Sequence, residues 1–279
     1  MTWTFTSDLA AYRAAAGPAV AARPVPNTLL LSVADALERR GLHAFGPAAP
    51  VFGWWTGPDG AVAGALVCTP PHPLQLGALP GEAVGALARA LTTEPLLAGL
   101  GGINARRPDA EALALAWGRP TVVAEEHRLY RLAALVAPQP APAGRARAAT
   151  EADLPLLVGW LEAFHTEVEI PAGPSEAQVR DRLSYGGFLV WEDGGVPVSL
   201  AAFSRPIGSA SRIGPVYTPP GFRGRGYAAA VTHAASEAAY AAGAAEVVLF
   251  TDLANPTSNR VYLRLGYRPV EDRARIVPA

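Results

Sequence analysis

The hydrophobic pattern of the chain predicts helices and strands in alternation after residue 150. Apolar residues recur at helical spacing from Asp153 to Phe164, a second helical stretch covers Ser175–Leu183, and another helix is expected at Thr257–Leu265. Short apolar runs predict strands between these helices. In chain order, the predicted strands are Phe188–Trp191, Val198–Phe203, Arg212–Thr218 and Val247–Thr251.

Two local features refine this pattern. Asp193-Gly194-Gly195 lies between two of the apolar runs, which predicts a hairpin. Pro215 stands inside the strand expected at Arg212–Thr218, and a proline cannot donate to a sheet ladder. We therefore expect an edge or a bulge at Pro215.

A proline-rich segment divides the chain almost in half. From Ala137 to Gly144, proline alternates with small residues, which favours an extended and semi-rigid spacer. The sequence therefore predicts a domain at residues 1–137, a Pro/Ala linker at residues 138–144 and a second domain at residues 145–279.

The two halves carry matching landmarks. Trp55 and Pro70 have the same separation as Trp191 and Pro206, and Pro108 and Gly118 have the same separation as Pro256 and Gly266. Two copies of one plan would explain both matches. Chance matching of tryptophans and prolines is the alternative.

A glycine-rich turn after the strand at Arg212–Thr218 predicts an anion site. The turn leads into a long alanine-rich helix that begins near Arg225, and the first N–H groups of a helix lack intrahelical partners. Gly224 and Gly226 would let a phosphate approach the backbone, and Arg223 and Arg225 add positive charge. A phosphate-bearing ligand is therefore expected at this turn.

These residues resemble a known family. Arg223, Gly226 and Ala228 follow the Arg/Gln-x-x-Gly-x-Gly/Ala pattern of the GCN5-related N-acetyltransferases (GNAT). Downstream, the run Asn255–Tyr262 followed by Leu265-Gly266-Tyr267 is similar to a second motif of that family. The chain has no Gly-Lys-Ser/Thr motif and no lysine at all, so other phosphate motifs do not fit.

The resemblance implies a fold and a ligand. The fold would be α/β with a mixed sheet (α+β), built as two tandem GNAT-like domains whose mostly antiparallel sheets are flanked by helices and contain splayed central strands. The ligand would be acetyl-CoA, whose pantetheine arm enters the gap between the splayed strands. Residues implied in cofactor binding are Val216, Tyr217, Thr218, Arg223, Gly224, Arg225, Gly226, Tyr227, Ala228, Asn255, Ser258 and Asn259.

The resemblance also implies a reaction, the direct transfer of an acetyl group to a primary amine. Tyr262 is expected to be the general acid that protonates the leaving thiolate, because a phenol with an ordinary pKa is protonated at neutral pH. No general base is identified, since Ser211-Arg212-Ile213-Gly214 contains no glutamate. Plainer structural interpretations remain open: Asn255 as a helix cap, Gly266 as a helix terminator, Tyr262 as core packing and Arg225 as a solvated charge.

The first half lacks the candidate catalytic and phosphate-binding side chains of the second half. At the corresponding separation, Ala114 stands where the second half has Tyr262, and Glu111 stands opposite Asn259. The turn expected near Leu79–Ala83 offers an acid and no arginine, and a carboxylate repels pyrophosphate. We therefore expect a degenerate copy at residues 1–137.

Composition limits the other possibilities. The chain has 279 residues and a net charge of −1, which argues against nucleic acid as a partner. Its one cysteine, Cys68, lies in an apolar run and excludes an internal disulfide, and no metal site is expected. Without a signal pattern or a long apolar span, neither membrane insertion nor export is expected, so the cytoplasm is the default, with a monomer or homodimer.

The acceptor is the least defined part. Glu162, His165, Glu167 and Glu169 cluster at the end of one predicted helix, and Asp252 follows a strand. These carboxylates would suit a cationic amine, but a solvated helix end is the alternative. Two other functions remain: a coenzyme A-binding regulator or sensor without turnover, and a structural interaction module.

Overall fold

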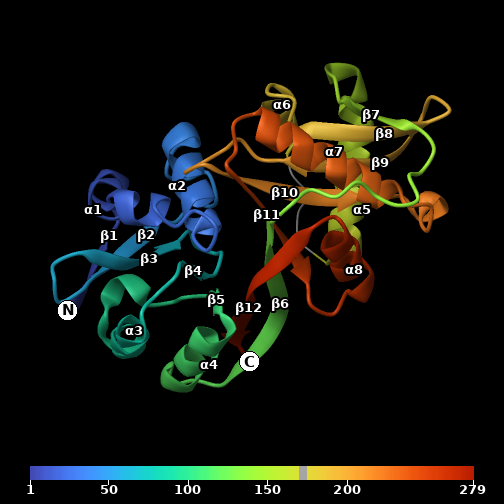
Figure 1. The fold of residues 1–279 in the computed structure, drawn as a ribbon. Coiled ribbons are helices and arrows are strands. Elements are labelled where there is room, and N and C mark those ends of the chain that lie inside the picture. Colours follow the sequence, from blue (N-terminus) through green and yellow to red (C-terminus); the bar gives the residue numbers. More distant parts are fainter. Residues whose placement is uncertain (170–174) are drawn as a thin grey trace. The chain divides into compact units, whose positions relative to one another are not determined.

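The computed structural model describes residues 1–169 and 175–279 and divides the chain into two compact units (Figure 1). The first unit comprises Met1–Leu129, Thr251–Ala254 and Pro269–Ala279, and the second comprises Tyr130–Phe250 and Asn255–Arg268. The boundaries therefore do not coincide with the proline-rich segment, because strands near the end of each half contribute residues to both units. The tandem division at residues 138–144 stays a prediction.

The first half begins with a strand and two helices and ends with a long strand. Along the chain its elements are β1 (Thr2–Thr6), α1 (Leu9–Ala21), α2 (Thr28–Arg40), β2 (Val51–Thr56), β3 (Val62–Cys68), β4 (Leu74–Leu76), α3 (Gly81–Thr93), β5 (Ile103–Arg106), α4 (Arg107–Ala116) and β6 (Thr121–Leu132). Strands β1 to β4 pair antiparallel in sequence, and β4 pairs parallel with β5.

The second half repeats this order of helices and strands. Its elements are β7 (Arg145–Ala148), α5 (Leu154–Glu167), α6 (Glu176–Leu183), β8 (Phe188–Asp193), β9 (Val196–Phe203), β10 (Ala210–Tyr217), α7 (Tyr227–Ala241), β11 (Glu246–Asp252), α8 (Pro256–Arg264) and β12 (Tyr267–Pro278). Strands β7 to β10 again pair antiparallel in sequence, and β10 again pairs parallel with β11. The matching landmarks fall on matching elements, with Trp55 in β2 and Trp191 in β8.

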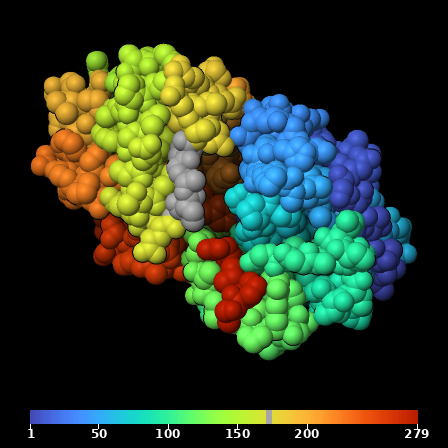
Figure 2. Space-filling model, turned by 180° about the vertical axis from the view of Figure 1, so that it is seen from behind, coloured from blue at the N-terminus to red at the C-terminus, as the bar shows by residue number. Residues whose placement is uncertain are grey.

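The last strand of the chain joins the sheet of the first unit. β12 pairs antiparallel with β5, from Arg273 opposite Arg106 to Ile276 opposite Ile103. Figure 2 shows the C-terminal segment in red beside green residues of the first half, and the Ala279 N–H donates to the Pro120 carbonyl. A strand distant in sequence therefore completes this sheet.

Helices cover both faces of the sheet in the second unit, because strand side chains point alternately to opposite faces. On one face, strand residues including Ile213 and Leu249 pack against α7 through Val231, Ala235 and Ala239. On the other face, Leu200 and Tyr217 pack against α5 and α6. Burial of these two apolar faces is the main stabilising contribution in this unit.

Strand β10 departs from regular pairing where Pro215 was expected to disturb it. Against β9, the register changes between Ile213 and Val216, which is a β-bulge. Against β11, pairing runs from Ala210 opposite Glu246 to Ile213 opposite Leu249 and goes no further. The expected bulge is confirmed, and from Gly214 onward β10 has lost its partnership with β11.

The predicted helices and strands of the second half are confirmed with small shifts at their ends. Thr150 and Asp153 form a capping box before α5, and Ser175 caps α6 with Gln178. Gly194 and Gly195 form the turn of the β8–β9 hairpin with positive φ angles. Cys68 is buried as expected, and burial raises the pKa of its thiol to about 11.

Candidate functional site

The glycine-rich turn leads into α7 with a left-handed cap. Gly226 is the N-cap at φ 83°, Gly224 lies at φ 76°, and both conformations favour glycine. The first helical hydrogen bond is donated by the Ala230 N–H to the Gly226 carbonyl, and no side chain of the described residues caps the helix. The N–H groups of Tyr227 and Ala228 are thus left available to a ligand.

Arg223 is held within the turn by two contacts. Its Nε donates to the Thr218 carbonyl at 2.9 Å, and its Nη2 donates to both carboxylate oxygens of Glu167, at 2.8 and 2.6 Å. The Tyr217 hydroxyl also donates to Glu167 at 3.2 Å, and this carboxylate contributes to a raised Tyr217 pKa, of which burial is the larger cause. Arg223, which was expected to bind the phosphate, is therefore already paired with the carboxylate of Glu167 at the end of α5.

Tyr227 and Arg225 flank the N-cap Gly226 in the chain. The Tyr227 side chain is buried and its hydroxyl donates to Asp193, and this hydrogen bond is the main reason that the Tyr227 pKa is raised. Arg225 lies over the ring of Phe222, with its guanidinium carbon 6.0 Å from the ring centre. Tyr227 thus anchors the helix start to the β8–β9 hairpin, while Arg225 remains exposed.

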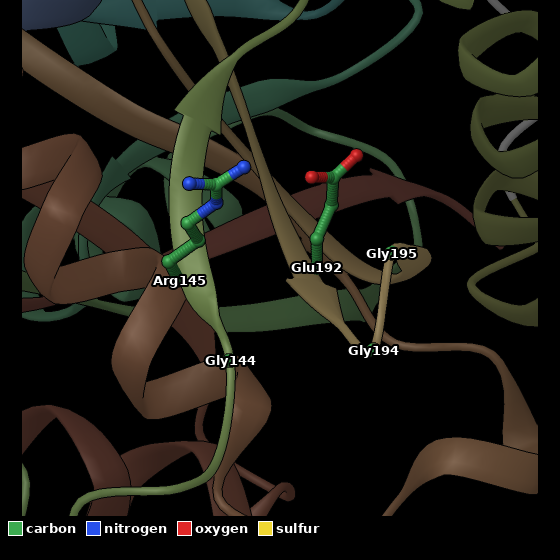
Figure 3. A pocket seen from close by; sticks show the side chains of 5 residues that line it. All are labelled: Gly144, Arg145, Glu192, Gly194 and Gly195. Atoms are coloured by element: carbon green, nitrogen blue, oxygen red, sulfur yellow. The ribbon is translucent and has the colours of Figure 1, made fainter.

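A pocket of about 390 Å³ lies beside this anchor, lined by Gly144, Arg145, Glu192, Gly194 and Gly195. Figure 3 shows Arg145 projecting from β7, Glu192 from β8 and the two glycines in the hairpin turn. The Glu192 carboxylate already accepts a hydrogen bond from Arg147 at 2.6 Å.

The expected ligand strand, β10, keeps some backbone groups occupied. The Tyr217 carbonyl accepts from Ser199 Oγ at 3.0 Å, and the Gly214 carbonyl accepts from Arg182 at 3.2 Å. With the Thr218 carbonyl bonded to Arg223, three acceptors near the bulge have partners. Val216 and Tyr217 are adjacent and in register with β9, so one of their two N–H groups faces β9 and the other is directed away from it, toward a ligand between β10 and β11.

The face of β10 toward α5 and α6 carries positive charge. Arg182 stacks over Phe188, with its guanidinium carbon 5.3 Å from the ring centre, and Arg212 stands next to Ile213 on the strand. Burial, and to a smaller extent the charge of Arg182, lowers the pKa of Arg212 to about 10. Of the carboxylates expected near the acceptor, Glu167 is the last residue of α5 and pairs with Arg223. Residues 170–174 lie outside the described residues.

The start of α8 is built by Asn255 and Asn259. Asn255 is the N-cap, and its Oδ1 accepts from the Ser258 N–H at 3.0 Å. Asn259 donates through Nδ2 to the Asn255 carbonyl at 2.7 Å and accepts at Oδ1 from the Tyr130 hydroxyl at 2.9 Å. Both asparagines thus have structural partners, and Gly266 ends the helix region at φ 95° as expected.

Tyr262 lies on α8, partly buried against the core of the second unit. Its ring centre is 6.4 Å from that of Tyr130 and 6.0 Å from that of Tyr267. Burial raises the pKa of Tyr262 to about 12, so the phenol stays protonated at neutral pH. Among the described residues, its hydroxyl has no hydrogen-bond partner, and Val216 of the bulged strand packs against the same core cluster.

The sequence-derived candidates therefore form two groups within the second unit: the turn Arg223–Ala228 after β10, and Asn255–Tyr262 on α8 after β11. The roles assigned to them stay predictions. Tyr130 and Asp193 were missed as partners of these groups. Nothing in the local sequence marks either residue, because each acts through a contact that only the folded sheet creates.

Residues 154–267 match the model of the acetyltransferase (GNAT) family. The resemblance drawn from the two motifs is confirmed for this domain, which contains both of them. No curated protein sequence matches the chain.

Solved structures show the same fold. An acetyltransferase from the GNAT family of Colwellia psychrerythraea is 10% identical, with a TM-score of 0.61 and 100% of both chains covered. A Drosophila protein is 12% identical, with a TM-score of 0.66 and coverage of 99% of this chain and 98% of that one. A GCN5-related N-acetyltransferase from Sphaerobacter thermophilus is 16% identical, with a TM-score of 0.56 and coverage of 98% and 94%. The expected mixed sheet flanked by helices is thus confirmed.

The described residues contain neither a cluster of metal-binding side chains nor a membrane-spanning helix. No group of three or more His, Cys, Asp or Glu side chains in residues 1–169 and 175–279 is placed to hold a metal ion. Within the same residues, no helix is long and apolar enough to cross a membrane.

Proposed function

We propose that the second unit transfers an acetyl group from acetyl-CoA to a primary amine. The observation that carries this proposal is the coincidence of two features at the end of β10: its separation from β11 after Ile213, and the uncapped start of α7 at Gly226. A gap between strands accepts an extended amide chain by backbone hydrogen bonds, and a helix N-terminus accepts phosphate. Acetyl-CoA carries both groups.

The turn fits the diphosphate sterically as well as electrostatically. A side chain at Gly224 would meet no atom within 4 Å, so the backbone there is open to a ligand. The N–H groups of Tyr227 and Ala228 supply donors that the helix does not use. Arg223 adds charge if its guanidinium moves from Glu167 to the diphosphate, since both partners are about half exposed.

The proposed reaction uses the backbone of β10 and the phenol of Tyr262. A neutral amine attacks the thioester carbonyl, and an N–H of Val216 or Tyr217 stabilises the oxyanion that forms. When the carbon–sulfur bond breaks, Tyr262 donates its proton to the thiolate, and the proton of the attacking nitrogen passes to water or to a carboxylate. The raised pKa of Tyr262 keeps the required proton in place.

The first half is proposed to be a degenerate copy that binds no acetyl-CoA. Only four residues connect β4 to α3, where the second half has nine between β10 and α7, and Glu82 lies in the first turn of α3. At the end of the parallel β4–β5 pair, the buried Arg273 guanidinium donates to the Leu76 carbonyl at 2.7 Å and to the Asn104 carbonyl at 3.1 Å. The space equivalent to the pantetheine gap is thus filled by a side chain of β12.

Calorimetric titration with acetyl-CoA, followed by a thiol-release screen over a panel of amines, tests the proposal. Binding with release of free thiol in the presence of an amine supports it. Tight binding without turnover for any amine would instead favour a coenzyme A-binding sensor. Absence of binding would leave an interaction module and would refute both.

A further inference from the structure

Tyr130 is a buried residue of β6 that contacts the candidate site of the second unit. It precedes the proline-rich segment, so the sequence assigned it to the first domain, yet it belongs to the second unit and is fully buried there. Its hydroxyl donates to Asn259 Oδ1 at 2.9 Å. A buried phenol of this kind needs a hydrogen-bond partner, and α8 supplies it.

The same side chain contacts two candidate residues at once. Asn259 and Tyr262 stand three positions apart on α8 and therefore share one face of the helix. The hydroxyl of Tyr130 reaches Asn259, while its ring lies against Tyr262 at a centre-to-centre distance of 6.4 Å and an interplanar angle of 56°. Tyr130 thus restrains the rotation of α8 about its axis and packs against one face of the Tyr262 environment, which limits the orientation of that ring.

The other side of Tyr262 is held by a second buried tyrosine. Tyr267 lies 6.0 Å from Tyr262, and its own hydroxyl is bonded to Ser236 Oγ at 2.7 Å. The hydroxyl of Tyr262 has no partner among the described residues. Its direction is therefore set by ring packing and by the position of α8 rather than by a hydrogen bond of its own.

We propose that Tyr130 is a positioning residue that aims the Tyr262 hydroxyl at the leaving sulfur. This inference rests on the proposed function, since it assigns Tyr130 a role through the general acid. Tyr130 lies in β6, before the proline-rich segment. A residue from the first half of the sequence would therefore contribute to the reaction. Proton donation is sensitive to geometry, so a small change in the direction of the Tyr262 hydroxyl lowers turnover more than it lowers cofactor affinity.

The alternative is that Tyr130 is only a core residue. If Tyr130 were only a core residue, its substitution would lower thermal stability. The substitution would also lower turnover by the same factor whether position 262 is Tyr or Phe. A positioning residue acts through the phenol of Tyr262, so its effect on turnover disappears when that phenol is absent. Comparison of two backgrounds therefore separates the roles.

The experiment uses the full chain with Tyr130→Phe, which removes the hydroxyl and keeps the ring. We expect kcat to fall about fivefold to tenfold, as for the loss of one hydrogen bond, with KM for acetyl-CoA unchanged within about twofold. In a Tyr262→Phe background, Tyr130→Phe should produce no further loss. The control is Tyr185→Phe, which removes a phenol that donates to the Phe203 carbonyl at 3.2 Å and should leave kcat unchanged.

The outcomes separate the inference from the proposed function. A wild-type chain that releases no thiol with any amine overturns the proposed function and the inference with it. An active wild type with an equally active Tyr130→Phe variant, or an equal loss in both backgrounds, overturns the inference alone. Should Tyr130→Phe fold poorly, Asn259→Ala removes the same hydrogen bond together with the one from Asn259 to the Asn255 carbonyl, and its kcat loss should be smaller in the Tyr262→Phe background than in the wild type; an equal loss in both backgrounds overturns the inference.

Discussion

Arg223 Nη2 lies 2.6 Å from Glu167 Oε2, so the arginine of the phosphate turn is bonded to the last residue of α5. This pair is about half exposed on both sides. Exposed ion pairs contribute roughly 0.2–1 kcal/mol, which is little compared with a diphosphate held by several donors. The pair would therefore compete with a diphosphate at the turn without excluding it.

The first prediction concerns this competition. Glu167→Gln removes the competing charge and should tighten acetyl-CoA binding by up to about fivefold, in line with the strength of an exposed pair. Arg223→Ala should weaken binding by about tenfold through loss of one charge-assisted contact. Calorimetry at fixed salt measures both. Weaker binding in Glu167→Gln would show that the pair shapes the turn rather than competes with the ligand.

The second prediction concerns Tyr262. Tyr262→Phe should lower kcat by about 10²-fold or more, while the Kd for acetyl-CoA stays nearly constant, because only proton donation is lost. Tyr240→Phe, a change to an exposed tyrosine on α7, is the control and should leave kcat unaltered. Since burial raises the pKa of Tyr262 to about 12, the wild-type rate should show no decline from loss of this proton up to about pH 10. Equal rates in wild type and Tyr262→Phe would remove the assigned role.

The third prediction concerns the number of ligands. Because Arg273 fills the end of the β4–β5 pair and no extended turn precedes α3, one acetyl-CoA should bind per chain. Calorimetric stoichiometry measures this directly. A value of two would show that the first half retains a working site.

The fourth prediction concerns the left-handed cap of α7. Gly226→Ala places a side chain at φ 83° and should lower the free energy of unfolding by about 1–2 kcal/mol. It should also weaken acetyl-CoA binding, because the new methyl group would stand at the phosphate turn. Gly221→Ala is the matched control: no atom lies within 4 Å of its added carbon, its φ angle is ordinary, and its stability should change by less than about 0.5 kcal/mol. Equal stability of the two variants would contradict the strained cap.

The fifth prediction concerns acid stability. Hydrogen bonds from Arg147, at 2.7 and 2.8 Å, are the main cause that lowers the pKa of Asp153 from its ordinary value to about 2. A depressed folded pKa stabilises the fold above the unfolded pKa, and the contribution disappears as the pH falls from about 4 to about 2. It amounts to about 2 kcal/mol.

Urea unfolding as a function of pH checks this contribution. Asp153→Asn should be less stable than wild type at pH 7, and the difference should shrink toward pH 2. Glu111→Gln, which breaks an exposed pair with Arg107, should change stability by less than about 0.5 kcal/mol. A constant difference between Asp153→Asn and wild type over this range would rule out the assigned cause.

Local signals in the sequence were sufficient for the elements of the second half. The apolar periods located α5, α6, β8 and β9, and Pro215 located the bulge in β10. The glycines at 224 and 226 located the start of α7, since they adopt conformations that other residues avoid. Each of these signals acts over a few neighbouring residues.

Contacts between residues that are distant in the chain could not be predicted from the sequence. The Arg223–Glu167 pair joins the ends of two elements that are distant in the chain, and nothing in either segment specifies the other. The contact of Tyr130 with Asn259 and the pairing of β12 with β5 arise only when the strands take their places in the sheets. Spacing alone related landmarks that fall on elements in the same order in each half, but it did not indicate that β12 would pair with β5.

The pairing of β12 with β5 has a consequence for the order of folding. During synthesis from the N-terminus, β5 is made well before the ribosome reaches residue 269, so one edge of β5 waits for its partner until nearly all of the second unit has emerged. Non-local strand pairing of this kind slows folding and leaves an edge open to wrong partners. The nascent first half therefore carries an unpaired strand edge until residues 273–276 have been made.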